Sequence, residues 1–419
     1  MLVFLSDVHM TDGSSGLTIK PTAFRIFAEN VRKLADSLRP NPPEEIRLVL
    51  LGDIFDIIRS TQWLSVNARP WDNAGPGQEA MVQQILNGII QKNKDSLAEF
   101  SGLRQWARQK DIPFGITYVM GNHDWLINRY AACRKSAAAA LGIAGSEPFA
   151  CQFFDPDYKI FARHGDIYDD FNYSGNRDAS SLGDAIVIEL LNKYPAQMTM
   201  RLKEFVEAGA VTADDAKWIG AQLRELDNIR PPYDAASWVL MVANKTQNEA
   251  ARRLIEKVWE SCVDAFFEVP FIKAKDRFML PDMVDFLQIA LKLSSHMSKW
   301  TLEKLAELKE KYFHDDPAGG YDKHALAETK VRSGEASFVL YGHTHDHLII
   351  PMDQIPLPER KQQDKIYFNT GTWRMTWNKV KFDPANREFV GWHVLSYVTI
   401  FKASENGPYN FEVWNAALG

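Results

Sequence analysis

The chain has 419 residues, of which 46% are hydrophobic and 24% charged, and its formal net charge is −6. This composition is ordinary for a globular protein and argues against disorder. A protein that mainly grips a nucleic-acid backbone usually has a basic surplus, so the acidic balance argues against nucleic acid as a partner. The length allows two or three domains, or one large domain with an insertion.

Three widely spaced cysteines, Cys133, Cys151 and Cys262, include no C-x-x-C pair. We therefore expect reduced cysteines in a cytoplasmic protein, rather than a disulfide framework or a thiolate metal site. The apolar opening at 1–5 is too short for a signal peptide, and no apolar run reaches the length of a membrane helix. The sequence thus predicts a soluble cytoplasmic protein with no membrane span.

Short apolar runs alternate with helical patterns over the first 170 residues, which predicts an α/β layout. Strands are expected at 2–5, 47–51, 115–120 and 158–163, and helices at 24–38 and across 81–108. Each predicted strand ends in polar residues, where open α/β sheets place their ligand sites. Strand signals return at 336–341 and 365–368, and the region 389–402 is typical of closing strands.

Amphipathic helices dominate the sequence between these two parts of the α/β pattern. They are predicted at 182–194, 213–226, 249–267, 284–293 and 299–312. We therefore divide the chain into a core of residues 1–174 and 334–419 and a helical insertion of residues 175–333.

Five short segments place metal-ligand residue types at the ends of predicted strands. They are Asp-Val-His at 7–9, Gly-Asp at 52–53, Gly-Asn-His-Asp at 121–124, His-Gly-Asp at 164–166 and Gly-His-Thr-His at 342–345. A glycine beside a ligand lets the backbone turn sharply and approach the site without a Cβ clash. Carboxylate, imidazole and amide ligands without a thiolate suit Mn, Fe, Zn or Ni better than calcium or a structural zinc site.

The spacing within the motifs suggests paired ligands. Asp7 and His9 lie two apart, so at an extended strand end both side chains point to one face, and His343 and His345 repeat this arrangement. Two such pairs and a shared carboxylate can serve two ions. Asp53 is the natural bridging ligand, because a carboxylate can span ions about 3.5–4 Å apart.

Each motif alone has an ordinary alternative. A lone D-x-H or G-D occurs by chance in most proteins of this size, whereas the ordered set of five leaves chance a share of roughly 5%. His347 is the alternative to His345 as a ligand. The two-residue alternation favours His343 and His345, and it leaves His347 at the surface.

The order D-x-H, G-D, G-N-H-D, H, G-H-x-H resembles the calcineurin-like metallophosphoesterase superfamily, and this chain fills every position of that pattern. The resemblance covers about residues 1–174 and 335–375. It implies an α/β fold, a four-layer α/β/β/α sandwich, with the large helical insertion added to it. It also implies two divalent metal ions, the first held by Asp7, His9, Asp53 and His345 and the second by Asp53, Asn122, His164 and His343.

The resemblance further implies catalytic roles for two residues of the third motif. His123 would stabilise the transferring phosphoryl oxygens or protonate the leaving group, and Asp124 would orient its ring. The implied activity is hydrolysis of a phosphomonoester, phosphodiester or pyrophosphate by in-line attack of a metal-bridging hydroxide. The substrate would be a phosphorylated small molecule or a nucleotide, and we expect the insertion 175–333 to form a cap that restricts what enters.

Several readings of the function stay open. The His-Gly-Asp motif followed by Asp169 and Asp170 is similar to the branch that includes UDP-2,3-diacylglucosamine pyrophosphatases. That branch commonly has arginine at the position of His123, and its chains are much shorter. One alternative is a metal-dependent nuclease of the same superfamily, which the acidic balance disfavours. Another is a non-catalytic metal-bearing scaffold, but such members typically lose ligands and this chain has lost none.

Other residues near the motifs are weaker candidates. Asp56, Asp169 and Asp170 could each fix a histidine tautomer through a hydrogen bond, or be solvated loop acids. The segment 369–373, Asn-Thr-Gly-Thr-Trp, follows a predicted strand and could shape the floor of the site. Four tryptophans could line a substrate pocket or simply pack in the core, namely Trp63, Trp71, Trp125 and Trp373.

Overall fold

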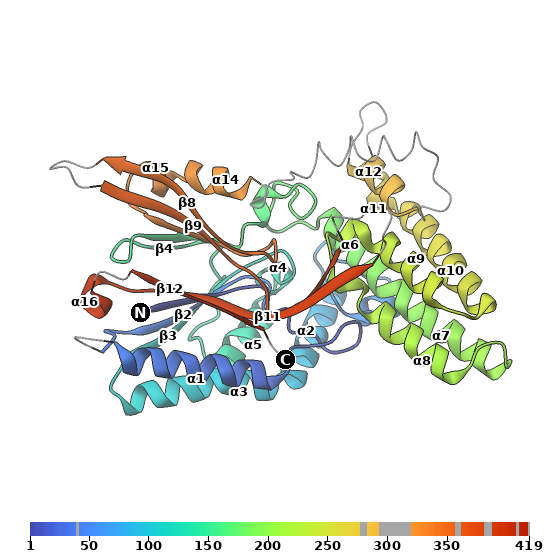
Figure 1. The fold of residues 1–419 in the computed structure, drawn as a ribbon, viewed down its shortest axis with the longest axis horizontal. Coiled ribbons are helices and arrows are strands. Elements are labelled where there is room, and N and C mark those ends of the chain that lie inside the picture. Colours follow the sequence, from blue (N-terminus) through green and yellow to red (C-terminus); the bar gives the residue numbers. More distant parts are fainter. Residues whose placement is uncertain are drawn as a thin grey trace.

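The computed structural model describes residues 1–38, 42–276, 283–292, 320–356, 362–380, 388–407 and 410–417. Within them the chain is a mixed α/β protein with two mixed β-sheets (Figure 1). The helix predicted at 299–312 lies outside the described residues.

Seven of the described strands form the first sheet, in the order β3-β2-β1-β11-β10-β6 with β12 also paired to β11. Their bounds are β1 (Leu2–Leu5), β2 (Ile46–Leu51), β3 (Phe114–Val119), β6 (Ile229–Arg230), β10 (Met375–Lys379), β11 (Phe389–Ile400) and β12 (Phe411–Ala417). Strands β1, β2 and β3 are parallel, and β11 runs antiparallel to β1.

The second sheet has the order β4-β5-β7-β9-β8. Its strands are β4 (Phe153–Asp155), β5 (Ile160–Ala162), β7 (Phe338–Tyr341), β8 (His347–Pro356) and β9 (Gln362–Thr370). Strands β5, β7 and β9 are parallel, whereas β4 and β8 run antiparallel to their neighbours.

The described helices fall into three groups along the chain. The first group is α1 (Pro21–Ser37), α2 (Pro76–Lys92), α3 (Lys94–Gln109), α4 (Trp125–Arg129) and α5 (Ala131–Leu141). The second is α6 (Leu182–Ile186), the π-helix η3 (Val187–Asn192), α7 (Lys193–Glu207), α8 (Ala213–Arg224), α9 (Ala235–Lys245), α10 (Glu249–Phe267), α11 (Pro270–Lys273) and α12 (Met283–Ala290). The third is α14 (Tyr321–Ala327), α15 (Thr329–Arg332) and α16 (Ala403–Asn406).

Strand β1 is fully buried because both faces of the first sheet are covered. Leu2 and Phe4 belong to the apolar cluster that also contains residues of β5, β7 and β9 in the second sheet. Val3 and Leu5, which alternate with them, belong to the cluster that contains the apolar face of α1. The period of two in a strand thus divides four consecutive apolar residues between a sheet–sheet core and a sheet–helix core.

The outer face of the second sheet packs on α14 and α15. Val339 and Tyr341 of β7 and Tyr367 of β9 form a third apolar cluster with residues of these two helices. In Figure 1, α14 and α15 lie along one side of the paired sheets, and α1 and α3 lie along the opposite side.

Most predicted elements are confirmed, with two informative differences. The helical region predicted across 81–108 is two helices that meet at Asn93, whose buried amide donates to the carbonyls of Thr11 and Ile89. The helix predicted at 182–194 contains the π-helix η3, which ends at Asn192, and the amide of Asn192 donates to the Ile58 carbonyl. In both places a buried amide bonds to a loop carbonyl outside its own helix.

The described part of the segment 175–333 is mainly helical, and it also contains one short strand. Strand β6 lies within it and pairs in parallel with β10, so that Arg230 is the register partner of Asn378. The apolar cluster under α1 also continues into the buried faces of α7, α9 and α10. Backbone pairing and a shared core therefore join this segment to the first sheet.

Across the described ranges, no helix combines the length and the apolar character needed to cross a membrane. The cytoplasmic location expected from the cysteine pattern stays a prediction.

Candidate metal centre

The five motifs meet at one edge of the two sheets. Asp7 and His9 follow β1, Asp53 follows β2 and Asn122 follows β3, while His164 follows β5 and the two histidines at 343 and 345 follow β7. Because β1, β2 and β3 are parallel, as are β5 and β7, their carboxyl ends lie together. The seven side chains are buried; that of His343, for example, is only 8% exposed.

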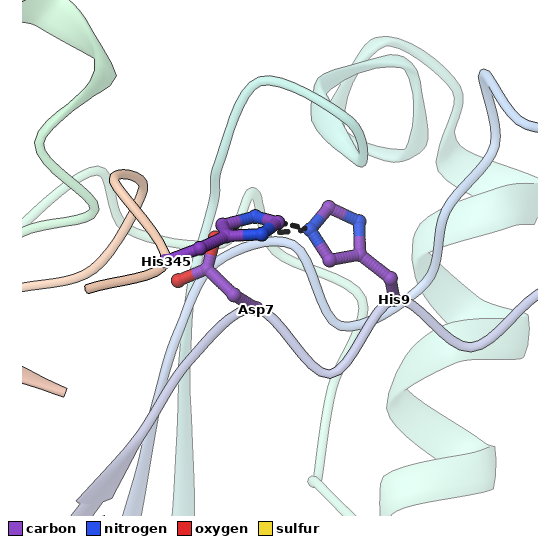
Figure 2. Close-up of side chains that lie close together, drawn as sticks. All are labelled: Asp7, His9 and His345. Atoms are coloured by element: carbon purple, nitrogen blue, oxygen red, sulfur yellow. Dashed lines mark hydrogen bonds and ion pairs between the residues drawn. The ribbon is translucent and has the colours of Figure 1, made fainter. Parts of the chain in front are cut away.

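The first set of donor atoms comes from Asp7, His9 and His345 (Figure 2). His345 Nε2 lies 3.0 Å from His9 Nε2 and 3.3 Å from Asp7 Oδ1, and His9 Nε2 lies 3.8 Å from the same oxygen. Among the described residues, no group donates a hydrogen bond to Asp7 Oδ1. A buried carboxylate oxygen that faces two imidazole nitrogens and lacks a donor fits a bound cation.

The second set comes from Asn122, His164 and His343. The Asn122 Oδ1 atom lies 3.1 Å from His164 Nε2 and 3.0 Å from His343 Nδ1. An amide oxygen and two imidazole nitrogens are again donors that divalent transition metals accept.

Asp53 lies between the two sets. Its Oδ2 atom is 3.3 Å from His164 Nε2 and 3.8 Å from His9 Nε2, while its Oδ1 atom accepts a hydrogen bond of 2.9 Å from the His123 backbone N–H. We expected one oxygen of this carboxylate to serve each ion. In the structure a single oxygen faces both sets, because the other is fixed by the backbone of the third motif.

Groups of His and Asp side chains in this cluster could therefore hold a metal ion. Ligand atoms lie within 4.8 Å of one another in three overlapping groups: Asp7, His9 and His345; His9, Asp53 and His123; and Asp7, Asp53 and His164. Sequence order alone left His347 as an alternative to His345, but it is His345 that reaches Asp7 and His9.

Hydrogen bonds on the far side of the rings fix which imidazole nitrogen faces the centre. His9 Nδ1 lies 2.8 Å from Asp56 Oδ2, His164 Nδ1 lies 2.7 Å from the Leu51 carbonyl, and His343 Nε2 lies 2.9 Å from Asp169 Oδ2. Such outward partners orient ligating histidines and select their tautomer. Asp56 and Asp169, weak candidates by sequence, thus contact donors directly.

The backbone at the donors is unusual. None of the seven donor residues is a glycine, yet five of them have a positive φ. The angles are 50° for Asp7, 47° for His9, 53° for Asp53, 71° for His343 and 66° for His345. We expected Asp7 and His9 to share a face because the strand end is extended. Instead, both members of each D-x-H and H-x-H pair occupy the left-handed region, which non-glycine residues enter at a cost.

The electrostatics of the cluster also call for positive charge. Burial disfavours a charged His164, but the Asp53 and Asp7 carboxylates raise its pKa to about 10. Burial would raise the pKa of Asp53 as well, yet His164 and His123 hold it well below its usual value. Protonation of His164 thus supplies, beside these carboxylates, positive charge that a metal cation could also supply.

The structure corrects the role expected for Asp124. We expected it to orient the His123 ring, but its carboxylate accepts from the backbone N–H groups of Gly121 (2.7 Å) and Ile54 (3.1 Å) and from the Tyr118 hydroxyl. Asp124 thus fixes the loops after β2 and β3. Burial, followed by repulsion from Asp53, raises its pKa to about 7.

Asp56 takes the role expected for Asp124. Its Oδ1 atom lies 2.8 Å from His123 Nδ1, while Oδ2 is bound to His9. One carboxylate therefore orients both the predicted catalytic histidine and a predicted metal ligand. Burial opposes its ionisation, but His123 and Arg59 hold the pKa of Asp56 far below its usual value.

Sequence reasoning missed a set of arginines and an aspartate behind the site. Arg59 Nε lies 3.3 Å from Asp56 Oδ2 and 2.7 Å from Asp227 Oδ2, and Arg374 Nη1 lies 3.2 Å from the same Asp227 oxygen. The Arg230 guanidinium contacts His345 Nδ1 at 2.9 Å and 3.2 Å. Asp227 and Arg230 belong to the segment 175–333, and no motif marks them in the sequence.

The segment 369–373 supports the first motif from below. The Thr372 hydroxyl donates to the Asp7 carbonyl at 2.7 Å, and the Thr370 hydroxyl lies 2.6 Å from that of Ser6. Trp373 is fully buried and donates to the Ser396 carbonyl. This segment therefore fixes the backbone of the site.

A small polar pocket borders the second donor set. Its lining includes Asn122, Trp125, Asn172, Tyr173, Arg177 and Asp184. Of the four tryptophans considered, only Trp125 lines this pocket; Trp63 and Trp373 are core residues, and Trp71 stacks on Phe271. The pocket combines groups of the core with the first residues of the segment 175–333.

Gly121→Ala should abolish metal binding, and circular dichroism of the variant establishes whether it is folded. A Cβ at this position would collide with Oδ1 of Asp53 and lie 2.7 Å from its backbone nitrogen, so the shared carboxylate must move. Metal content after loading with Mn²⁺ and dialysis, measured by elemental analysis, should fall toward zero. Gly220→Ala on α8 is the control, because nothing lies within 4 Å of its added Cβ, and its metal content should equal that of the wild type.

Asp53→Asn should reduce metal content at both donor sets together, because one Asp53 oxygen faces both. A calorimetric titration with Mn²⁺ should show that the affinity of both binding steps falls by about tenfold or more, which is the effect of losing a charged ligand contact. Retention of two ions per chain with unchanged affinity would rule out the shared position.

Comparison with known proteins assigns the chain to no family. No family model matches it, and no curated protein gives a significant match. The functional interpretation therefore depends on the geometry of the described residues and on the motif resemblance.

Proposed function

We propose that this protein is a dinuclear metal-dependent phosphohydrolase of the calcineurin-like metallophosphoesterase superfamily. The observation that carries the proposal is that two buried donor sets of three side chains each face one Asp53 oxygen. Their composition agrees with the ligand sets that the motif resemblance implies. Two-metal sites of this kind are typical of phosphate-ester hydrolysis.

The proposal includes the four-layer α/β/β/α sandwich. It is supported by the apolar clusters, in which the two sheets share one core, α1 packs on the outer face of the first sheet, and α14 and α15 pack on the outer face of the second. It also includes the cap. That part is supported by Arg230 against His345 and by the pocket that the start of the segment 175–333 shares with Asn122.

The proposed ligands are Asp7, His9, Asp53 and His345 for one ion and Asp53, Asn122, His164 and His343 for the other. Mn, Fe, Zn or Ni would suit these nitrogen and oxygen donors. The chemistry that two such ions supply when bound is neutralisation of phosphoryl charge and a lowered pKa of water. The chain's own contribution is to hold His9, His164 and His343 with their outward nitrogens already bonded to acceptors, so these three rings need little reorganisation.

His123 is placed to act on the leaving group. Asp56 holds its Nδ1 atom, and among the described residues no group bonds to Nε2. Burial disfavours the charged ring, but Asp56 and Asp53 raise the pKa of His123 to about 9. In the metal-free protein these carboxylates favour the protonated ring, and we propose that its Nε2–H is the proton given to a departing alkoxide.

The activity is tested with a panel of a phosphomonoester, a phosphodiester and a pyrophosphate in the presence of Mn²⁺. We expect hydrolysis of at least one of these substrates. Chelation should abolish the activity and added metal should restore it, because the proposed reaction needs the metal ions to activate water and to neutralise the phosphoryl charge. Inactivity toward the whole panel in protein that retains two ions per chain would favour the non-catalytic scaffold. Salt-sensitive cleavage of DNA would favour the nuclease.

His123→Ala should lower kcat by about 10²–10⁴-fold for an alkyl phosphate, the usual contribution of a general acid. Its effect on p-nitrophenyl phosphate should be smaller, because nitrophenolate leaves without a proton. Metal content should stay normal, and His324→Ala on α14, outside the donor sets, is the control. An equal loss for both leaving groups would indicate phosphoryl stabilisation, and unchanged kcat would show that His123 has no catalytic role.

A further inference from the structure

Arg230 joins the segment 175–333 to the first donor set. Its backbone is fixed in β6, and its Nη1 atom donates to the carbonyls of Asp227 (3.0 Å) and Ile229 (2.8 Å). The remaining edge of the guanidinium, formed by Nε and Nη2, faces His345 Nδ1 at 3.2 Å and 2.9 Å. The Nη1 atom is therefore held by two backbone carbonyls, whereas the Nε and Nη2 atoms both point to one neutral acceptor, His345 Nδ1.

The carboxylates nearest to Arg230, those of Asp227, Asp7 and Asp346, attract it without a direct ion pair. Arg59 and Arg374 both pair with Asp227, and Arg59 also pairs with Asp56. In the described part of the chain, no carboxylate lies within ion-pair distance of Arg230. The outer edge of this guanidinium therefore meets one neutral nitrogen where a fork of two N–H groups can bind two anionic oxygens.

The contact with His345 is incompatible with metal ligation by that histidine. Figure 2 shows its ring directed toward His9 and Asp7, with Nε2 as the inward atom. A neutral imidazole that ligates through Nε2 carries its proton on Nδ1 and cannot accept there. The Nε and Nη2 donors of Arg230 would then face another donor and lose their acceptor.

We propose that Arg230 leaves His345 when this histidine ligates a cation and then binds the terminal phosphoryl group of a phosphomonoester. The inference rests on the proposed function and names its substrate class. The Nε and Nη2 edge is a fork that matches two oxygens of one phosphoryl group, and the guanidinium lies one imidazole ring away from the first donor set. A terminal phosphoryl group has three non-bridging oxygens for two ions and an arginine, whereas a diester has two.

The test measures binding of inorganic phosphate by calorimetry to the Mn²⁺-loaded and the metal-free protein. In the loaded protein, Arg230→Gln should weaken phosphate binding by about tenfold to a hundredfold, the effect of losing a charge-assisted contact. In the metal-free protein, the same substitution should change the phosphate affinity by less than about twofold, because Arg230 is then bonded to His345. Arg230→Lys, which keeps the charge but not the fork, should fall between.

Arg224→Gln on α8 removes an exposed cation from the same segment and should match the wild type throughout. Metal content of every variant is measured in parallel. Unchanged phosphate affinity in loaded Arg230→Gln and Arg230→Lys would overturn the proposal, as would an equal loss in the metal-free protein. Wild-type preference for diesters over monoesters would also overturn it.

Failure of the proposed function gives a different result. If loaded wild-type protein hydrolyses no phosphoester but its phosphate affinity still depends on Arg230, the assignment of Arg230 as a phosphoryl-binding residue stands and the hydrolase assignment falls. If it hydrolyses monoesters with a KM that Arg230→Gln leaves unchanged, the hydrolase assignment stands and that of Arg230 falls.

Discussion

Three buried carboxylates, Asp7, Asp53 and Asp56, meet beyond the ends of β1 and β2. Each needs positive charge nearby, and the surrounding histidines and arginines are placed accordingly. Burial alone would keep such groups neutral, since a desolvated anion is costly. Asp56 is matched by Arg59 and by two imidazole rings. Asp7 and Asp53 have histidines and no arginine within ion-pair distance in the described chain, so a bound metal ion could balance their charge.

The segment 175–333 takes part in this charge balance. Asp227 pairs with Arg59, which pairs with Asp56, which in turn orients His9 and His123. A chain of direct contacts therefore runs from this segment to the proposed general acid. A segment that only covered the site would need no such buried ionic link, because burying these charges costs free energy unless each is paired. A shift of the segment 175–333 would therefore move Asp227 and, through Arg59, disturb the position of Asp56 in the site.

The meeting of these side chains at one edge could be predicted because it follows from the topology. Parallel strands that end at one edge bring Asp7, Asp53 and Asn122 together wherever the intervening helices lie. Arg230 could not be predicted, since it lies far from every motif and reaches the site only because β6 pairs with β10. The exchange of roles between Asp56 and Asp124 was equally hidden. Asp124 belongs to the third motif and Asp56 follows the second by three residues, and only the loop geometry decides which carboxylate faces the ring.

The positive φ angles show that the paired side chains of the first and fifth motifs meet for a geometric reason other than the extended strand end we expected. A left-handed non-glycine residue costs about 1–2 kcal/mol, and five of the donors adopt this conformation. Asp and His tolerate it better than most residues, and these are the residue types that the chemistry requires. Alternating left-handed residues curl the chain, so that both side chains of a D-x-H pair reach inward from a strand that has already ended. The neighbouring glycines then matter for close approach: a side chain at Gly342 would collide with Ser6 and Asp7, as one at Gly121 would with Asp53. The strain is local, and the well-packed cores on both faces of the first sheet are what allow the fold to carry it.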